Sequence, residues 1–91
     1  MTKMVCKLSN YMKSPSAHLL EVDNLEIYFS YETPIAFRNE EGTMIVSENV
    51  WGSTTGRHIA ALGVDKKDRI PSEEFDALLG EYIARRVRRI G

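Results

Sequence analysis

Hydrophobic and polar positions alternate through much of the first half of the chain. The hydrophobic positions of the clearest stretch are Leu25, Ile27, Phe29 and Tyr31, and the positions between them are Glu26, Tyr28 and Ser30. A period of two is typical of a β-strand with one buried face. Shorter stretches of β-like sequence lie at residues 18–22, 35–38 and 43–50. Together they predict an antiparallel β-meander of three to five strands, with one hydrophobic face and one acidic, wetter face.

Turn-forming residues separate these stretches. Asp23 and Asn24 tolerate positive φ and predict a tight turn, and Gly42 is the expected left-handed residue of a hairpin loop at 39–42. Pro15 lacks an amide donor and breaks regular structure. We therefore interpret residues 1–16 as an edge strand or a loose arm.

The second half of the chain has a helical period. Residues 55–62 predict a short helix with Ser53 or Thr54 as its N-cap and Gly63 just past its end. Residues 73–90 predict a long helix that follows a capping Ser72, and Gly80 within it suggests a close approach to the sheet. The predicted buried stripe of this helix comprises Phe75, Leu78, Leu79, Tyr82, Ile83, Val87 and Ile90.

These elements predict a single α+β domain over residues 1–91. Its antiparallel sheet is followed by a short helix and a long C-terminal helix packed on one sheet face. A domain of 91 residues has a small core and gains from burying a surface against a partner or a second copy. A homodimer formed through an open sheet edge is therefore a further expectation.

The charge is nearly balanced overall but unevenly distributed. The formal net charge is −1, so no global field attracts the chain to nucleic acid or to a membrane. Acidic residues gather between residues 21 and 48, where Arg38 is the one base. Cys6 is the only cysteine, which excludes an intrachain disulfide and a thiolate zinc cluster. With no apolar run long enough to cross a bilayer, the expected location is the cytoplasm.

Three blocks of sequence resemble a family of small uncharacterised bacteriophage and prophage proteins. The blocks are Ile27-Tyr28-Phe29-Ser30-Tyr31 with Thr33-Pro34-Ile35-Ala36-Phe37, Asn49-Val50-Trp51 with Thr54-Thr55-Gly56-Arg57-His58-Ile59, and Asp65-Lys66-Lys67 with Arg69-Ile70. The resemblance covers about residues 25–75 and is strongest at 49–59. It implies a viral origin and a location in the host-cell cytoplasm. It transfers no catalytic role, and accessory proteins of this kind often bind and block a host machine.

The turn at residues 52–58 is the main candidate for chemistry. Its glycines and hydroxyls suggest a phosphate loop, but it lacks the glycine spacing and the Gly-Lys-Ser/Thr ending of that motif. His58 with Asp65 and Asp68 matches no metal-ligand spacing, and no nucleophile has a base at a recognised spacing. We therefore expect no enzyme, no cofactor and no metal, and interpret His58 as a residue of the helix surface.

Two surfaces are candidates for binding. Trp51 is interpreted either as a plug of the core or as an interaction anchor, since tryptophan is enriched in binding hot spots. The predicted protein-binding residues are Glu26, Tyr28, Trp51, Arg57 and His58. The predicted nucleic-acid-binding residues of the alternative function are Arg85, Arg86, Arg88 and Arg89, whose other role is to complement the helix dipole.

The leading functional hypothesis is a non-enzymatic phage accessory protein that binds a host protein complex and inhibits a defence system such as CRISPR-Cas. The first alternative is a nucleic-acid-binding protein that uses the C-terminal arginines. The second alternative is a small ligand-binding domain or enzyme at the turn between Ser53 and His58. The acidic residues and the slightly negative net charge favour the binding of a host protein over the binding of nucleic acid.

Overall fold

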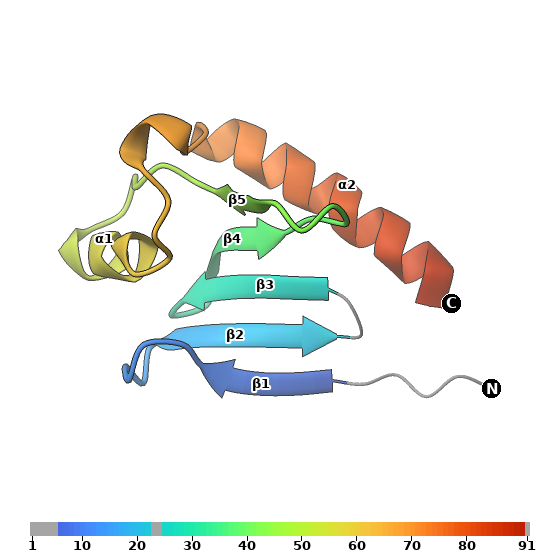
Figure 1. The fold of residues 1–91 in the computed structure, drawn as a ribbon, viewed down its shortest axis with the longest axis horizontal. Coiled ribbons are helices and arrows are strands. Elements are labelled where there is room, and N and C mark those ends of the chain that lie inside the picture. The colour runs from blue at the N-terminus through green and yellow to red at the C-terminus, as the bar shows by residue number, and fades with distance from the viewer. Residues whose placement is uncertain (1–5, 23–24, 91) are drawn as a thin grey trace.

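The computed structural model describes the chain over residues 6–22 and 25–90, and its side chains over 7–22 and 25–85. The strands are β1 (Cys6–Asn10), β2 (Ala17–Val22), β3 (Leu25–Ser30), β4 (Thr33–Arg38) and β5 (Met44–Val46). They form one antiparallel sheet in the order β1-β2-β3-β4-β5. The helices α1 (Ser53–Ala60) and α2 (Ser72–Ile90) follow, with a short 3-10 turn (Lys66–Asp68) between them (Figure 1). The predicted α+β meander is confirmed.

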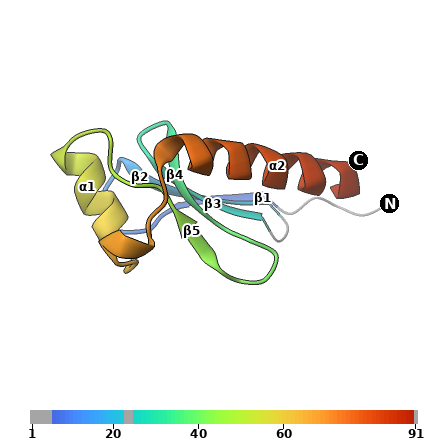
Figure 2. The same cartoon turned by 90° about the horizontal axis from the view of Figure 1, so that it is seen from above.

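Helix α2 packs on one face of the sheet, as Figure 2 shows. Phe75, Leu79 and Tyr82 of α2 are buried against Ile27 and Phe37 of the sheet. The ring of Phe37 stacks on Tyr82, with centroids 4.9 Å apart, and lies 5.7 Å from the ring of Phe75. These aromatic contacts and the aliphatic side chains around them form the first core.

The opposite face of the sheet is covered over part of its area, so the prediction that this whole face is wet and acidic is wrong. A second cluster of buried residues there comprises Tyr28, Ile35, Ala36, Val46 and, from α1, Ile59. Tyr11 packs edge-to-face on Tyr28 with ring centroids 5.3 Å apart, and its hydroxyl donates to the carbonyl of Phe29 at 2.9 Å. Burial and the neighbouring Tyr28 raise the pKa of Tyr11 to about 12. Sequence alternation missed this layer because Tyr11 and α1 are supplied by distant parts of the chain.

A β-bulge in β4 sends Ile35 into the second cluster. Tyr28 pairs with Ala36 but Phe29 pairs with Pro34, which leaves Ile35 as the extra residue. In a regular strand Ile35 and Phe37 would share a face. Instead Phe37 lies in the α2 core and Ile35 lies on the α1 side.

The two edges of the sheet differ. Beyond β5, the amide of Glu48 donates to the carbonyl of Ile70 at 2.8 Å, and the amide of Ile70 donates to Val46 at 2.9 Å. This backbone segment covers the β5 edge. Strand β1, which pairs with β2, is the other edge of the sheet.

Several local predictions are confirmed and others are wrong. Gly42 and Gly63 have φ of 86° and 77°, as their predicted left-handed roles require. Tyr31, with φ of 58°, belongs to the β3–β4 turn and not to a strand. Nothing lies close to the position of a Cβ on Gly80, so its expected approach to the sheet is wrong. Helix α1 begins at Ser53 with Gly52 as its N-cap and no side-chain cap bond, so the predicted Ser53 or Thr54 cap is also wrong.

The long C-terminal helix is confirmed, with one change to its buried stripe. Leu79 is buried, but the preceding Leu78 is 38% exposed because it lies on the flank of the packed face. Helix α2 begins at Ser72 itself. The predicted turn at Asp23 and Asn24, residues 1–5, and the side chains of residues 86–90 lie outside the described part of the chain. Within that part, no helix combines the length and the hydropathy that crossing a membrane requires.

Candidate functional site

The loop that joins β5 to α1 exposes two large hydrophobic side chains in succession. Val50 is 54% exposed and Trp51 is 42% exposed. The interpretation of Trp51 as a core plug is therefore wrong. The core beside this corner is filled by Ile59 and Val46, and the indole remains at the surface. We call residues 49–52 the Trp51 corner.

Asn49 holds the Trp51 corner in place. Its side-chain oxygen accepts the amide of Trp51 at 3.0 Å, and its side-chain nitrogen donates to the carbonyl of Gly52 at 3.2 Å. This is the local bonding by which asparagine favours a turn. The same amide lies against α1 at Gly56, where an added Cβ would come within 2.9 Å of the Asn49 nitrogen. The lack of a side chain at Gly56 therefore leaves room for the side chain of Asn49 against α1.

A pocket of about 450 Å³ opens beside the Trp51 corner. Its lining residues are Glu48, Asn49, Gly56, Ala60, Lys66 and Arg69. Arg69 is fixed by a hydrogen bond of 3.1 Å from its Nε to the carbonyl of Val64. Two cationic side chains and one carboxylate therefore line a pocket that shares Asn49 with the Trp51 corner. Lys66 and Arg69 belong to a block that carries the family resemblance, but they were not among the predicted binding residues.

His58 belongs to a buried polar network that ties α1 to the sheet. It is 2% exposed, so its interpretation as a surface histidine is wrong. Its Nδ1 lies 2.6 Å from the hydroxyl of Ser30, which in turn lies 2.8 Å from the hydroxyl of Thr55. Its Nε2 lies 3.5 Å from the hydroxyls of both Ser14 and Ser16 in the β1–β2 connection. Burial, with smaller contributions from Arg57 and His18, lowers the pKa of His58 below its ordinary value.

This network has the residue types of a nucleophile and a base without the geometry of a catalytic triad. In a triad, the imidazole nitrogen away from the nucleophile bonds to a carboxylate that holds the ring and stabilises its charged form. Here that nitrogen faces Ser30, and none of the hydrogen bonds among the described side chains joins His58 to a carboxylate. The described residues also contain no group of three or more His, Cys, Asp or Glu side chains arranged to hold a metal ion. The arrangement joins three elements through hydroxyl groups.

The residues predicted at the turn between Ser53 and His58 therefore point in different directions. Ser53 and Arg57 are exposed, whereas Thr55 and His58 are buried. The turn does not assemble them into one site. Of this group, Arg57 is exposed on α1, the helix that follows the Trp51 corner, and His58 connects α1 to the sheet through Ser30.

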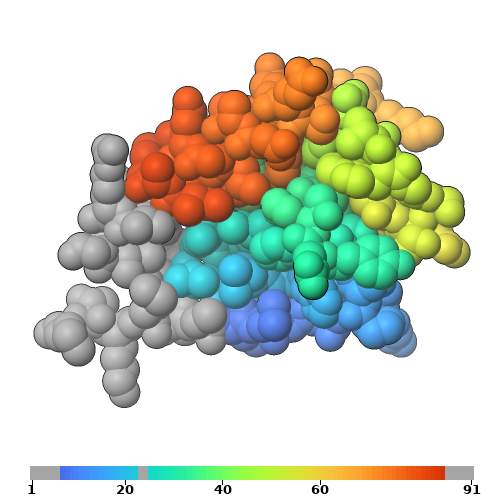
Figure 3. All heavy atoms as spheres, turned by 180° about the vertical axis from the view of Figure 1, so that it is seen from behind, coloured from blue at the N-terminus to red at the C-terminus, as the bar shows by residue number. Residues whose placement is uncertain are grey.

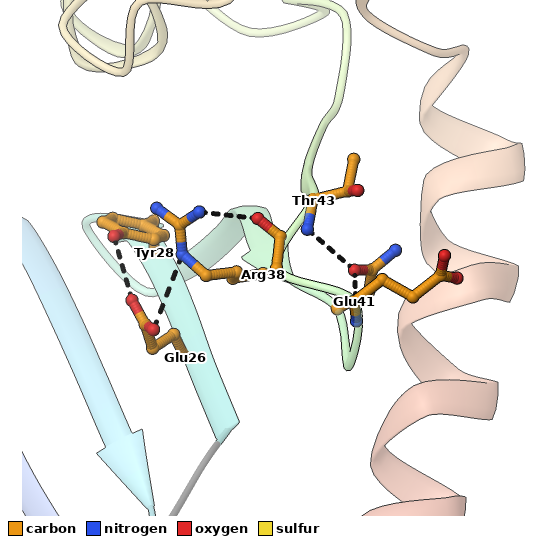
Figure 4. A network of polar contacts seen from close by, with 7 residues as sticks. Glu26, Tyr28, Arg38, Glu41 and Thr43 are labelled. Carbon is orange, nitrogen blue, oxygen red and sulfur yellow. Dashed lines mark hydrogen bonds and ion pairs between the residues drawn. The ribbon is translucent and has the colours of Figure 1, made fainter.

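Glu26 and Tyr28 form a separate polar network, drawn in Figure 4. The hydroxyl of Tyr28 donates to Glu26 at 3.3 Å, and the other oxygen of Glu26 lies 3.5 Å from the Nε of Arg38. Arg38 also donates to the carbonyl of Gly42 at 2.8 Å. Burial is the main cause that raises the pKa of Tyr28. Because Tyr28 is buried and Arg38 neutralises Glu26, this pair does not form the open acidic surface that the sequence predicted.

Of the C-terminal arginines, the structure describes the side chain of Arg85. Its guanidinium lies 3.3 Å from the carboxylate of Glu40 in the β4–β5 turn. An exposed pair of this kind contributes little to stability, but it places an acid beside the predicted phosphate-binding cluster. The side chains of Arg86, Arg88 and Arg89 lie outside the described part.

Comparison with protein families identifies the chain's family. A model of a family of unknown function (DUF8033) matches residues 4–77, and the chain belongs to this family. The match includes all five strands, the Trp51 corner and α1, and it ends within α2. No curated protein and no solved structure matches the chain.

Proposed function

We propose that this member of the DUF8033 family is a non-enzymatic protein-binding module whose contact site is the Trp51 corner. The observation that carries the proposal is the exposure of Val50 and Trp51 side by side in a loop fixed by Asn49. Tryptophan has a large apolar surface and one N–H donor, and it is among the residues most enriched in binding hot spots. Leaving an indole in water has a cost that burial in a complex would remove.

The rigidity of the corner supports the same proposal. A loop that is already ordered loses little conformational entropy on binding, so more of the contact energy contributes to affinity. The two hydrogen bonds of Asn49 and its close contact with Gly56 supply that order. The pocket that shares Asn49 with the corner is lined by Lys66 and Arg69 as well. A partner surface with an apolar recess next to a carboxylate fits this arrangement.

The resemblance to small phage and prophage proteins supports a viral origin and suggests the class of partner. We propose that the partner is a host protein complex and that binding inhibits it, with a defence system such as CRISPR-Cas as the expected target. Nucleic acid is the less supported partner, because the acidic Glu40 lies beside Arg85 and the net charge is −1.

Affinity capture with matched variants tests the proposal. The tagged chain, its Trp51→Ala variant and its Leu78→Ala variant are used to capture proteins from a host lysate, with mass spectrometry of the captured proteins. Leu78 is the control because it is a similarly exposed hydrophobic residue on α2. The proposal predicts a host complex that the wild type and Leu78→Ala retain and Trp51→Ala loses. Retention of the complex by all three proteins, or capture of no host complex by the wild type, would contradict it.

A further inference from the structure

Strand β1 is an open sheet edge with an unusually exposed hydrophobic residue at its centre. Leu8 is 67% exposed, the highest value among the large hydrophobic residues that the structure describes. Among those residues, β2 is the only strand that pairs with β1. The β5 edge differs, since Ile70 covers it.

The hydrogen-bond pattern of the sheet shows which backbone groups of β1 face outward. The amide of Tyr11 donates to Ala17 at 3.3 Å, which makes these opposed residues a hydrogen-bonded pair. Such pairs alternate along an antiparallel ladder, so Lys7 and Ser9 bond to β2 and Leu8 does not. The hydrogen bonds between β2 and the β3 side of the sheet are consistent with this alternation, because the amide of Tyr31 donates to the carbonyl of Ser16 at 2.7 Å. The N–H and C=O groups of Cys6, Leu8 and Asn10 therefore point away from the sheet.

The side chain of Leu8 continues a hydrophobic row that α2 leaves uncovered. Leu8 lies opposite Leu20, which lies opposite Ile27, and Ile27 faces α2. In Figure 3 the atoms of α2 lie over the upper strands, and the atoms of β1 and β2 remain visible below them. The row is thus buried at its α2 end and open at its β1 end.

We infer that β1 pairs with β1 of a second copy of this chain, in an antiparallel register centred on Leu8. Directly opposed residues point to the same face of a sheet, so the row becomes Leu20, Leu8, Leu8 of the second copy and Leu20 of the second copy. The outward N–H and C=O groups of the two Leu8 residues bond to each other, and those of Cys6 bond to Asn10. The result is a continuous sheet of two meanders related by a two-fold axis.

Charge selects this register over its neighbours. A shift that centres the pairing on Lys7 would place two lysines directly opposite each other, which is unfavourable. A shift to Ser9 would replace the contact between leucines by a contact of Leu8 with Asn10. In the register centred on Leu8, each Lys7 lies opposite Ser9, and the two lysines are diagonal neighbours at about 7–8 Å. A second copy satisfies these conditions with its own β1 residues, whereas an unrelated strand would have to match them.

Analytical ultracentrifugation of the full chain, from low micromolar to a few hundred micromolar, tests the inference. We expect the wild type to form a dimer in this range. Leu8→Lys opposes two charges at the axis and should raise the dissociation constant at least tenfold, while Leu78→Lys should leave it unchanged. Circular dichroism melts confirm that the variants are folded. A monomeric wild type at the highest concentration, or a Leu8→Lys variant that dimerises normally, would overturn the inference.

Cross-linking tests the register and does not depend on the charged variant. In a Cys6→Ser background, Leu8→Cys should give a covalent dimer on mild oxidation, because directly opposed Cα atoms lie within disulfide range. Ser9→Cys in the same background should not, since its two copies are diagonal and too far apart. A covalent dimer from Ser9→Cys alone, or from neither variant, would contradict this register. Strand β1 is distinct from the Trp51 corner, so either proposal can fail without the other.

Discussion

At the scale of single residues, His58 shows how burial determines a role that spacing cannot. Its neighbours in sequence suggested a surface histidine, but its partners Ser14, Ser16 and Ser30 come from other elements. Serine is common throughout globular proteins, so no residue type in the sequence marked these contacts in advance. The same limit applied to Trp51, whose exposure follows from the bonds of Asn49 and not from its own hydropathy.

The lowered pKa of His58 predicts a stability that depends on pH. The folded chain favours the neutral imidazole, whereas the unfolded chain takes up a proton near the ordinary pKa of 6.5. Stability should therefore be complete above this value and should fall as the pH decreases through it. Urea melts between about pH 7.5 and pH 5.5 avoid most carboxylate titration. His58→Gln should be less stable at neutral pH and less sensitive to acid, and an unchanged pH dependence in this variant would contradict the assignment.

Gly56 of α1 lies against the side chain of Asn49, which holds the Trp51 corner in place. Gly56→Ala should gain up to about 1 kcal/mol from helix propensity, but its Cβ displaces the side chain of Asn49. We expect a melting temperature close to that of the wild type together with a change in the emission and iodide quenching of Trp51, the only tryptophan. Gly80→Ala, where nothing is close to the new Cβ, is the matched control and should leave the fluorescence unchanged. A native signal in Gly56→Ala would show that Asn49 does not position the indole.

At the scale of elements, hydrophobic periodicity predicted the secondary structure of most segments but not all of the packing contacts that these segments make. The alternation from Leu25 to Ser30 and the three- and four-residue spacing in α2 correspond to β3 and to the helix that packs on it. The second core was missed because it depends on the bulge at Ile35 and on Tyr11 from the β1–β2 connection. Such features depend on tertiary pairing, which hydrophobic patterning of one segment does not contain.

Two adjacent leucines of α2 provide a test of the element-level account. Leu79 is buried in the first core, so Leu79→Ala should lower the free energy of unfolding by about 2–5 kcal/mol. Leu78 is partly exposed, and Leu78→Ala should cost well under half as much. Both substitutions have the same helix propensity change, so chemical denaturation isolates burial. Equal losses, or a larger loss at Leu78, would show that the packed face of α2 is wrongly assigned.

At the scale of the whole molecule, the structural surfaces and the proposed binding surfaces lie in different places. The two layers that cover the sheet are structural, and the proposed binding surfaces lie at the Trp51 corner and at the β1 edge. The layers use the hydrophobic residues that form the core, and His58 and Tyr28 belong to these layers although the sequence placed them at a binding site. Three of the five exposed large hydrophobic residues among those described lie at the Trp51 corner and the β1 edge, and the other two are Tyr31 in the β3–β4 turn and Leu78 on α2. We therefore propose partner binding at the corner and self-association at the edge.

A binding titration with the purified host partner tests the central claim most directly. The claim is that Trp51 is the anchor of a protein-binding site, so Trp51→Ala should weaken binding by at least about 2 kcal/mol, or about thirtyfold. Leu78→Ala should bind within a factor of about two of the wild type, because most residues outside a hot spot contribute little. Both variants should show the melting behaviour of a folded chain. Equal affinities of the Trp51→Ala variant and the wild type for that partner would contradict the account.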